Sequence, residues 1–127
     1  MGALIYEPIN GPDSDPVLVG LSRLADNAQQ VFAGGSDEVL PELFRAGGSP
    51  GGARPKALIA VKGDKIVIAD GEVPQGFTSW LVKFSAKGDF PDTGNIEYAY
   101  SLMAKDAGLE MPETELMEGQ HFAVQRF

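Results

Sequence analysis

The stretch from Gly47 to Lys56 has the composition of a phosphate-binding loop. Four of the six residues from Gly47 to Gly52 are glycine, so their backbone N–H groups can point into one concavity without side chains in the way. Arg54 and Lys56 would add positive charge at its rim. The spacing matches neither the P-loop pattern nor the dinucleotide-binding pattern. By composition alone, a flexible linker between helices and a sheet is the favoured alternative.

Lys83 lies in a segment that predicts a central strand. In SWLVKF, residues 79–84, alternation places Trp80, Val82 and Phe84 on one face and Leu81 and Lys83 on the other. Both faces are otherwise apolar, and an ammonium there requires a partner because its desolvation is costly. The alternative is a lysine on an edge strand that reaches water. The segment alone leaves both interpretations open.

Glu97 offers the partner that Lys83 would need. The sequence predicts that it lies in the first turn of a helix from about Ile96 to Ala107. A strand lysine followed by a glutamate on the next helix is the arrangement of protein kinases, in which the lysine holds the ATP phosphates and the glutamate orients it. Taken alone, a glutamate such as Glu97 is more often an acid stabilised by the dipole at the start of a helix.

The elements that position these residues predict one α+β domain, 1–127, with a mostly antiparallel sheet. In its first part, 1–46, we expect a strand at 3–7 and a helical hairpin, whose first helix starts at Asp15 and Pro16 and whose second follows Ser36. Its second part, 47–127, holds the glycine-rich loop, a sheet and one helix. The strands expected there are 57–62 and 65–69 around Gly63 and Asp64, 79–85, and a hairpin of 114–118 and 120–126 around Gly119.

Composition narrows the function classes. The chain has 127 residues, a net charge of -8 and no basic cluster, which argues against direct binding to nucleic acid. It has no apolar run long enough to cross a membrane and no signal peptide. The absence of cysteine excludes disulfides and fits the cytoplasm. With His121 as the one histidine, we expect no metal site.

Several segments together resemble the HipA family of bacterial serine/threonine kinases, the toxins of HipBA-type toxin–antitoxin modules. They are GGSPGGARPKALI, SWLVKF, NIEYAYSLMAKDAGLEMPETEL and HFAVQRF, with GALIY and SRLADNAQQV nearer the start. The resemblance covers nearly the whole chain and implies the N-terminal lobe of a protein-kinase-like fold. It also implies ATP-dependent phosphorylation of a serine on a protein, such as an aminoacyl-tRNA synthetase, and a HipB-like antitoxin as a partner.

The resemblance assigns a role to each matching residue. Lys83 matches the lysine that contacts the ATP phosphates, and Glu97 matches the helix glutamate beside it. The residues that match the family's glycine-rich loop over the nucleotide phosphates are Gly48, Ser49, Gly51, Gly52, Ala53, Arg54 and Lys56. Ser49 matches the loop serine whose autophosphorylation switches the kinase off. Gln125 to Phe127 match the hinge between the lobes, whose backbone binds the adenine. Many members have glutamate at the position of Gln125, and a contact made by the backbone tolerates this difference.

The resemblance also implies parts that these 127 residues do not contain. Family members begin with a further small β-rich subdomain, and their C-terminal lobe carries the catalytic aspartate and the magnesium ligands. Phe127 lies within an apolar run, so we expect a longer native protein and no kinase activity from the fragment alone. One alternative is a stand-alone, non-catalytic binding or regulatory module with half a kinase fold. Another is a degenerate relative without catalysis, against which Lys83, Glu97 and GGARPK argue.

Overall fold

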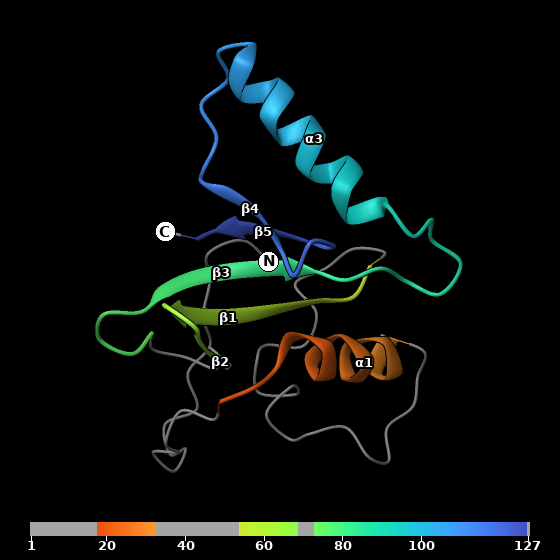
Figure 1. Cartoon of the computed structure of the whole chain (residues 1–127), viewed down its shortest axis with the longest axis vertical. Coiled ribbons are helices and arrows are strands. Elements are labelled where there is room, and N and C mark those ends of the chain that lie inside the picture. The colour runs from red at the N-terminus through yellow and green to blue at the C-terminus, as the bar shows by residue number, and fades with distance from the viewer. Residues whose placement is uncertain (1–17, 33–53, 69–72, 127) are drawn as a thin grey trace.

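The computed structural model describes residues 18–32, 54–68 and 73–126 (Figure 1). In this part of the chain, two helices accompany a five-stranded antiparallel sheet with the strand order β2-β1-β3-β5-β4. The elements are α1 (Leu21–Phe32), β1 (Lys56–Lys62), β2 (Lys65–Ile68), β3 (Thr78–Lys83), α3 (Thr93–Asp106), β4 (Thr114–Met117) and β5 (His121–Gln125). The predicted α+β class is confirmed. The strand expected at 3–7 and the short helix expected after Ser36 lie outside the described residues.

Both predicted hairpins are present. Lys62 and Lys65 are the last pair between β1 and β2, and Gly63 between them has a φ of 56°, which glycine adopts without steric cost. Met117 pairs with His121 at the end of β4 and β5. In that turn Gly119 has a φ of 70°. Local turn chemistry therefore determines both connections.

Helix α1 begins at Leu21, so the predicted start at Asp15 and Pro16 is wrong. Leu18 forms an isolated bridge with Val67 of β2, and the N–H of Val19 donates to the carbonyl of Ile66 at 3.0 Å. Residues just before Gly20 are thus extended against the sheet, and this pairing replaces the first turn of the expected helix.

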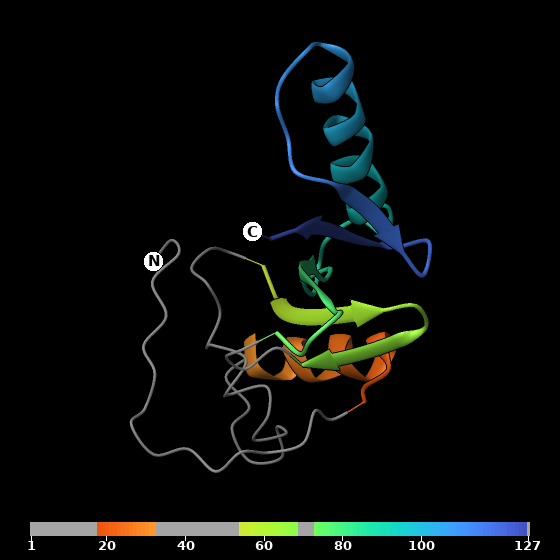
Figure 2. The same ribbon diagram turned by 90° about the vertical axis from the view of Figure 1, so that its left-hand side faces the viewer.

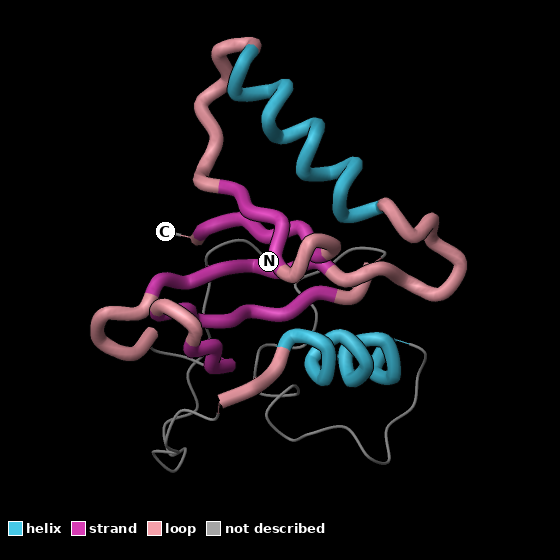
Figure 3. The backbone as a smooth tube through the Cα atoms, viewed as in Figure 1, coloured by secondary structure: helices cyan, strands magenta, loops and turns pink. Residues whose placement is uncertain are grey.

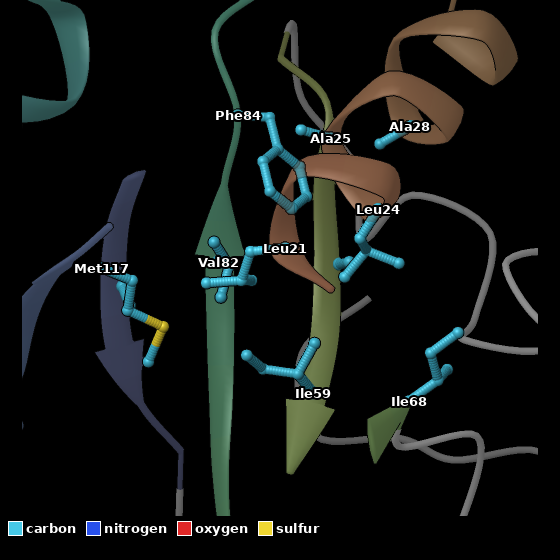
Figure 4. Close-up of a cluster of buried hydrophobic side chains, with 11 residues drawn as sticks. Leu21, Leu24, Ala25, Ala28, Ile59, Ile68, Val82, Phe84 and Met117 are labelled. Atoms are coloured by element: carbon cyan, nitrogen blue, oxygen red, sulfur yellow. The ribbon is translucent and has the colours of Figure 1, made fainter. Parts of the chain in front are cut away.

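The core lies between α1 and one face of the sheet (Figure 2). Figure 4 shows Leu21 and Leu24 of α1 beside Ile59 of β1 and Val82 of β3. The buried cluster comprises Leu21, Leu24, Ala25, Ala28, Ala57, Ile59, Ile68, Val82, Phe84, Met117 and Ala123, with Trp80 packed against it. The α1 members of this cluster are spaced three and four residues apart, so they form one buried face of the helix. Trp80, Val82 and Phe84 share one face of the sheet, so Lys83 lies on the other.

Helix α3 packs on the β4–β5 hairpin and extends beyond the sheet (Figures 1 and 3). The hydroxyl groups of Ser101 and Thr114 lie 3.0 Å apart. The helix ends at Asp106, before Gly108, as predicted, but it begins at Thr93 rather than near Ile96. The cause is the buried Gly94: a Cβ on this residue would lie 1.9 Å from the carbonyl oxygen of Gln120. Close packing against the hairpin thus outweighs the poor helix propensity of glycine.

Neither helix among the residues described is long and apolar enough to cross a membrane.

Candidate functional site

Lys83 is at the end of the central strand. Its Cα pairs with that of Lys56 in β1 on one side and with that of Phe122 in β5 on the other. Direct partners in an antiparallel sheet point to the same face, so the three side chains form a row. We call Lys56, Lys83 and Phe122 the lysine row. The Nζ of Lys83 lies 5.1 Å from the centre of the Phe122 ring. The alternative of an edge-strand lysine is therefore wrong.

Glu97 of α3 binds two cations at once. Its Oε2 accepts a hydrogen bond from the Nζ of Lys83 at 2.7 Å, and its Oε1 accepts one from the Nη1 of Arg54 at 2.9 Å. The side chains of Lys83 and Glu97 are 34% and 25% exposed, so water screens this pair less than a surface pair. Because α3 starts at Thr93, Glu97 lies in its second turn, and the prediction of the first turn is wrong. The helix dipole is correspondingly weaker as an explanation for Glu97.

Asp89 holds the other side of Arg54. Its Oδ2 lies 3.1 Å from the Nε of Arg54 and also accepts the N–H of Ala86 at 2.9 Å. Sequence reasoning did not single out Asp89. The available signal was an aspartate in the polar stretch AKGDFPDTG, where such side chains commonly bond to nearby backbone. That signal indicates a turn residue and gives no hint of Arg54.

A small pocket lies at this junction of strand, loop and helix. Its lining residues are Arg54, Lys83, Phe84, Ser85, Thr93, Gly94, Glu97 and Phe122. Two of its cations are already paired with Glu97. The cavity has a volume of about 10 Å³, room for about one water molecule, so a phosphate would bind at its rim. There it would meet an ammonium and a guanidinium whose positions are fixed, which lowers the conformational entropy lost on binding.

A second row, made of apolar side chains, lies beside the lysine row. Leu58, Leu81 and Val124 are direct partners across β1, β3 and β5. All three are partly exposed. Leu81 is two residues from Lys83, so both rows are on the same face, about 7 Å apart along the strand. We call these three residues the apolar row. Sequence reasoning placed Leu81 on the face of Lys83 but could not align three strands.

The sequence-predicted site residues are only partly brought together. Arg54, Lys83 and Glu97 meet at this site, and Lys56 is the strand partner of Lys83. The residues that lie outside the described part of the chain are Gly48, Ser49, Gly51, Gly52, Ala53 and Phe127. Gln125 pairs with Trp80 on the α1 face, opposite Lys83. Its N–H donates to the carbonyl of Glu113 at 2.8 Å, and that of Arg126 donates to Ser79 at 2.9 Å. A contact from either backbone to an adenine would therefore use a carbonyl.

His121 is buried, with 7% of its surface exposed. Its ring meets that of Phe84 edge to face at 5.1 Å, and neither ring nitrogen has a hydrogen-bond partner in the described part of the chain. Burial lowers the pKa of His121, and the charge of Glu118 opposes this in part. The described residues contain no group of three or more His, Cys, Asp or Glu side chains placed to hold a metal ion.

Comparison with known proteins identifies the family. The family model described as the HipA-like C-terminal domain matches residues 48–127, a narrower range than the nearly complete resemblance expected above. No curated protein and no solved structure matches the chain. The matched range contains the loop, Lys83, Asp89, Glu97 and all five strands. Because the match extends over more than half of the chain, this protein belongs to the HipA-like C-terminal domain family.

Proposed function

We propose that this chain is the nucleotide-binding N-terminal lobe of the kinase domain in a HipA-like serine/threonine protein kinase. The observation that carries the proposal is the contact between Lys83 and Glu97 at 2.7 Å. Phosphoryl transfer depends on positioning and on the electrostatic stabilisation of the phosphates. A lysine on a central strand, fixed by a glutamate from the adjacent helix, supplies a positioned ammonium for that purpose.

The face of the sheet that carries Lys83 fits ATP in both polarity and spacing. The phosphates would bind at the lysine row, beside Arg54 at the end of the glycine-rich loop. The purine would lie on the apolar row, whose Leu58, Leu81 and Val124 are partly exposed. The ribose would span the distance of about 7 Å between the rows.

Magnesium has no assigned ligand in this proposal. Glu97 already accepts from two cations, and Asp89 accepts from Arg54 and a backbone N–H. The catalytic aspartate and the magnesium ligands would therefore belong to a longer parent protein. We expect no phosphoryl transfer from residues 1–127 alone, and steady phosphorylation of any protein by this pure chain would contradict that expectation.

The role of the parent rests on the family resemblance. It would act in the cytoplasm and phosphorylate a protein serine, with an aminoacyl-tRNA synthetase as the proposed kind of substrate and a HipB-like antitoxin as the proposed partner. Phosphorylation of Ser49 would lower its ATP affinity, because a phosphoserine carries about two negative charges that repel the ATP phosphates. A parent carrying Ser49→Asp with unchanged ATP affinity would contradict this regulation.

Titration calorimetry with ATP and magnesium tests nucleotide binding by the chain itself. Lys83→Met removes the charge and keeps an unbranched side chain on Phe122. A hydrogen bond to a charged group is worth about 1.5–3 kcal/mol, so we expect affinity to fall by about tenfold or more. Lys65→Met, on the exposed β2 end, is the matched control and should leave affinity unchanged. Absence of ATP binding by the unaltered chain, or equal affinity in Lys83→Met, would refute the proposal.

A stand-alone binding or regulatory module is the second candidate. It would bind ATP through the same residues, so calorimetry does not separate it from the fragment of a kinase. Capture of the native protein that carries GGARPKALI, followed by its intact mass, does. A mass well above 13.5 kDa supports the kinase parent, whereas a mass near 13.5 kDa supports the module. In the longer parent, Lys83→Ala should abolish phosphoryl transfer without unfolding the protein.

A further inference from the structure

Arg54 is held by two carboxylates from different parts of the chain. Its Nη1 donates to Glu97 on α3 at 2.9 Å, and its Nε pairs with Asp89, in the connection between β3 and α3, at 3.1 Å. A guanidinium presents several N–H donors in one rigid plane, so the two contacts together determine its orientation. A lysine has a single nitrogen at the end of a flexible side chain and could not reproduce this geometry.

Asp89 is itself fixed in place. The N–H of Ala86 donates to its Oδ2 at 2.9 Å, and the N–H of Asp89 donates to the carbonyl of Ala86 at 3.1 Å. These reciprocal bonds close a tight turn. The Asp89 side chain is only 19% exposed, whereas the Arg54 side chain is 40% exposed. Asp89 is therefore both better shielded than Arg54 and fixed by its own turn.

Glu97 connects this arrangement to Lys83. One oxygen of its carboxylate is bonded to Arg54 and the other to Lys83. Loss of Arg54 from its position would leave the Glu97 carboxylate with its contact to Lys83 alone, so one of the two bonds that orient it would be missing. The link from Asp89 through Arg54 to Glu97 therefore constrains the pair that the proposed function depends on.

We propose that Asp89 is a positioning residue that orients Arg54 on Glu97 and so ties the end of the glycine-rich loop to the Lys83–Glu97 pair. Its consequence for nucleotide binding rests on the function proposed above. The positional part concerns contacts within this chain and can be measured without any nucleotide.

The first experiment follows the Nε–H of Arg54 by NMR in the 127-residue chain without ligand. Asp89→Asn removes the charge but retains an oxygen that can accept the N–H of Ala86. We expect the Arg54 Nε–H to exchange with water about tenfold faster than in the unaltered chain, because it loses a charge-assisted bond. Asp92→Asn removes a charge three residues away, from an exposed side chain that makes no capping hydrogen bond, and should change nothing. Equal exchange in Asp89→Asn and the unaltered chain would overturn the proposal.

The second experiment measures ATP affinity by calorimetry in Asp89→Asn, Arg54→Lys and the double variant. Arg54→Lys keeps the positive charge and the Asp89–Ala86 turn but loses the two-point contact of the guanidinium with Asp89 and Glu97. It therefore tests the same contact if Asp89→Asn folds poorly. If both singles act by releasing Glu97, the double variant will bind ATP no more weakly than the weaker single, within about twofold. Independent, multiplicative losses would overturn the proposal, as would equal changes in Asp89→Asn and Asp92→Asn.

The two experiments separate this inference from the proposed function. If the unaltered chain binds no ATP, the proposed function fails, while proton exchange at Arg54 still decides whether Asp89 positions it. If ATP binds and depends on Lys83 but proton exchange at Arg54 is insensitive to Asp89, the function stands and this inference fails.

Discussion

Replacing Gly94 by alanine should separate α3 from the β4–β5 hairpin. The added Cβ would lie 1.9 Å from the carbonyl oxygen of Gln120, 2.9 Å from its carbonyl carbon and 3.3 Å from the backbone nitrogen of Phe122. A carbon normally approaches a carbonyl oxygen no closer than about 3.3 Å. The start of α3 must therefore move by at least about 1.4 Å. Backbone lies on both sides of the clash, so no side chain can rotate away to relieve it.

The cost follows from this geometry. Overpacking typically destabilises a protein by about 1–3 kcal/mol, and a clash between two backbones belongs at the upper end. About 3 kcal/mol corresponds to a fall in melting temperature of about 10 °C for a domain of this size. Glu97 lies one turn beyond Gly94, and the same movement would lengthen its 2.7 Å contact with Lys83 to about 4 Å, past hydrogen-bonding distance.

Thermal unfolding followed by circular dichroism measures the first effect, and NMR spectra of Glu97 and Lys83 measure the second. The matched control is Gly20→Ala, because a Cβ on Gly20 meets nothing within 4 Å. Gly20 precedes α1, where alanine in place of glycine should cost under about 1 kcal/mol. If Gly94→Ala melted within about 2 °C of the control and kept the Lys83–Glu97 contact, the packing argument would be wrong.

Three further predictions concern stability. Burial lowers the pKa of His121 in the folded state below its ordinary value of 6.5, so the unfolded chain binds this proton more readily. The free energy of unfolding should therefore keep its full value above about pH 6.5. Below that pH it should fall by at most about 1.4 kcal/mol per pH unit. Urea unfolding at pH 7.5 and 5.5 measures this loss, and His121→Phe should reduce it; an unchanged pH dependence in that variant would assign the loss to other groups. Ser101→Ala removes hydrogen bonds to the carbonyl of Tyr98 and the hydroxyl of Thr114. Denaturant unfolding should show that the free energy of unfolding falls by about 1–2 kcal/mol. If Ser101→Ala with Thr114→Val cost the sum of the two single variants, the two hydroxyls would not share a bond. Leu24→Ala should cost about 2–5 kcal/mol in the same assay, since Leu24 is fully buried, whereas Leu102→Ala on exposed α3 should cost much less, and similar losses would refute the assignment of the core.

The features that sequence predicted well depend on neighbouring residues. Gly63 and Gly119 indicated both hairpins because each turn needs a backbone conformation that glycine adopts freely. The two apolar faces around Lys83 favoured a strand covered on both faces, while the segment alone left a central and an edge position open. These patterns are readable within about ten residues of sequence.

The features that sequence missed depend on residues far apart in the chain. The start of α1 was wrong because Leu18 and Val19 pair with β2, about fifty residues away. The start of α3 was wrong because the need for Gly94 arises from its contact with Gln120. Asp89 was not singled out, because nothing near it in the sequence indicates its contact with Arg54.

In the candidate site, too, some features could be predicted from the sequence and others depend on residues far apart in the chain. The partnership of Lys83 with Glu97 was anticipated by analogy with kinases, and the structure places the two in contact. The apolar row required the register of β1, β3 and β5 together, which depends on how two separate strand pairings align. A sequence gives the alternation within each strand but leaves that alignment to tertiary packing.

The ion pairs around Arg54 and Lys83 have a consequence for how an anion would reach the lysine row. The chain as a whole carries a net charge of -8, so a polyanion approaching from a distance is repelled and meets Lys83 and Arg54, each beside a carboxylate, only at close range. Salt should therefore affect the approach of the anion more than the contacts made after it binds. Modest ionic strength screens the long-range repulsion and speeds association, whereas the short, partly buried contacts that hold the bound anion are screened less. A plot of association rate against ionic strength should rise, and a basic protein with the same pocket would show the reverse.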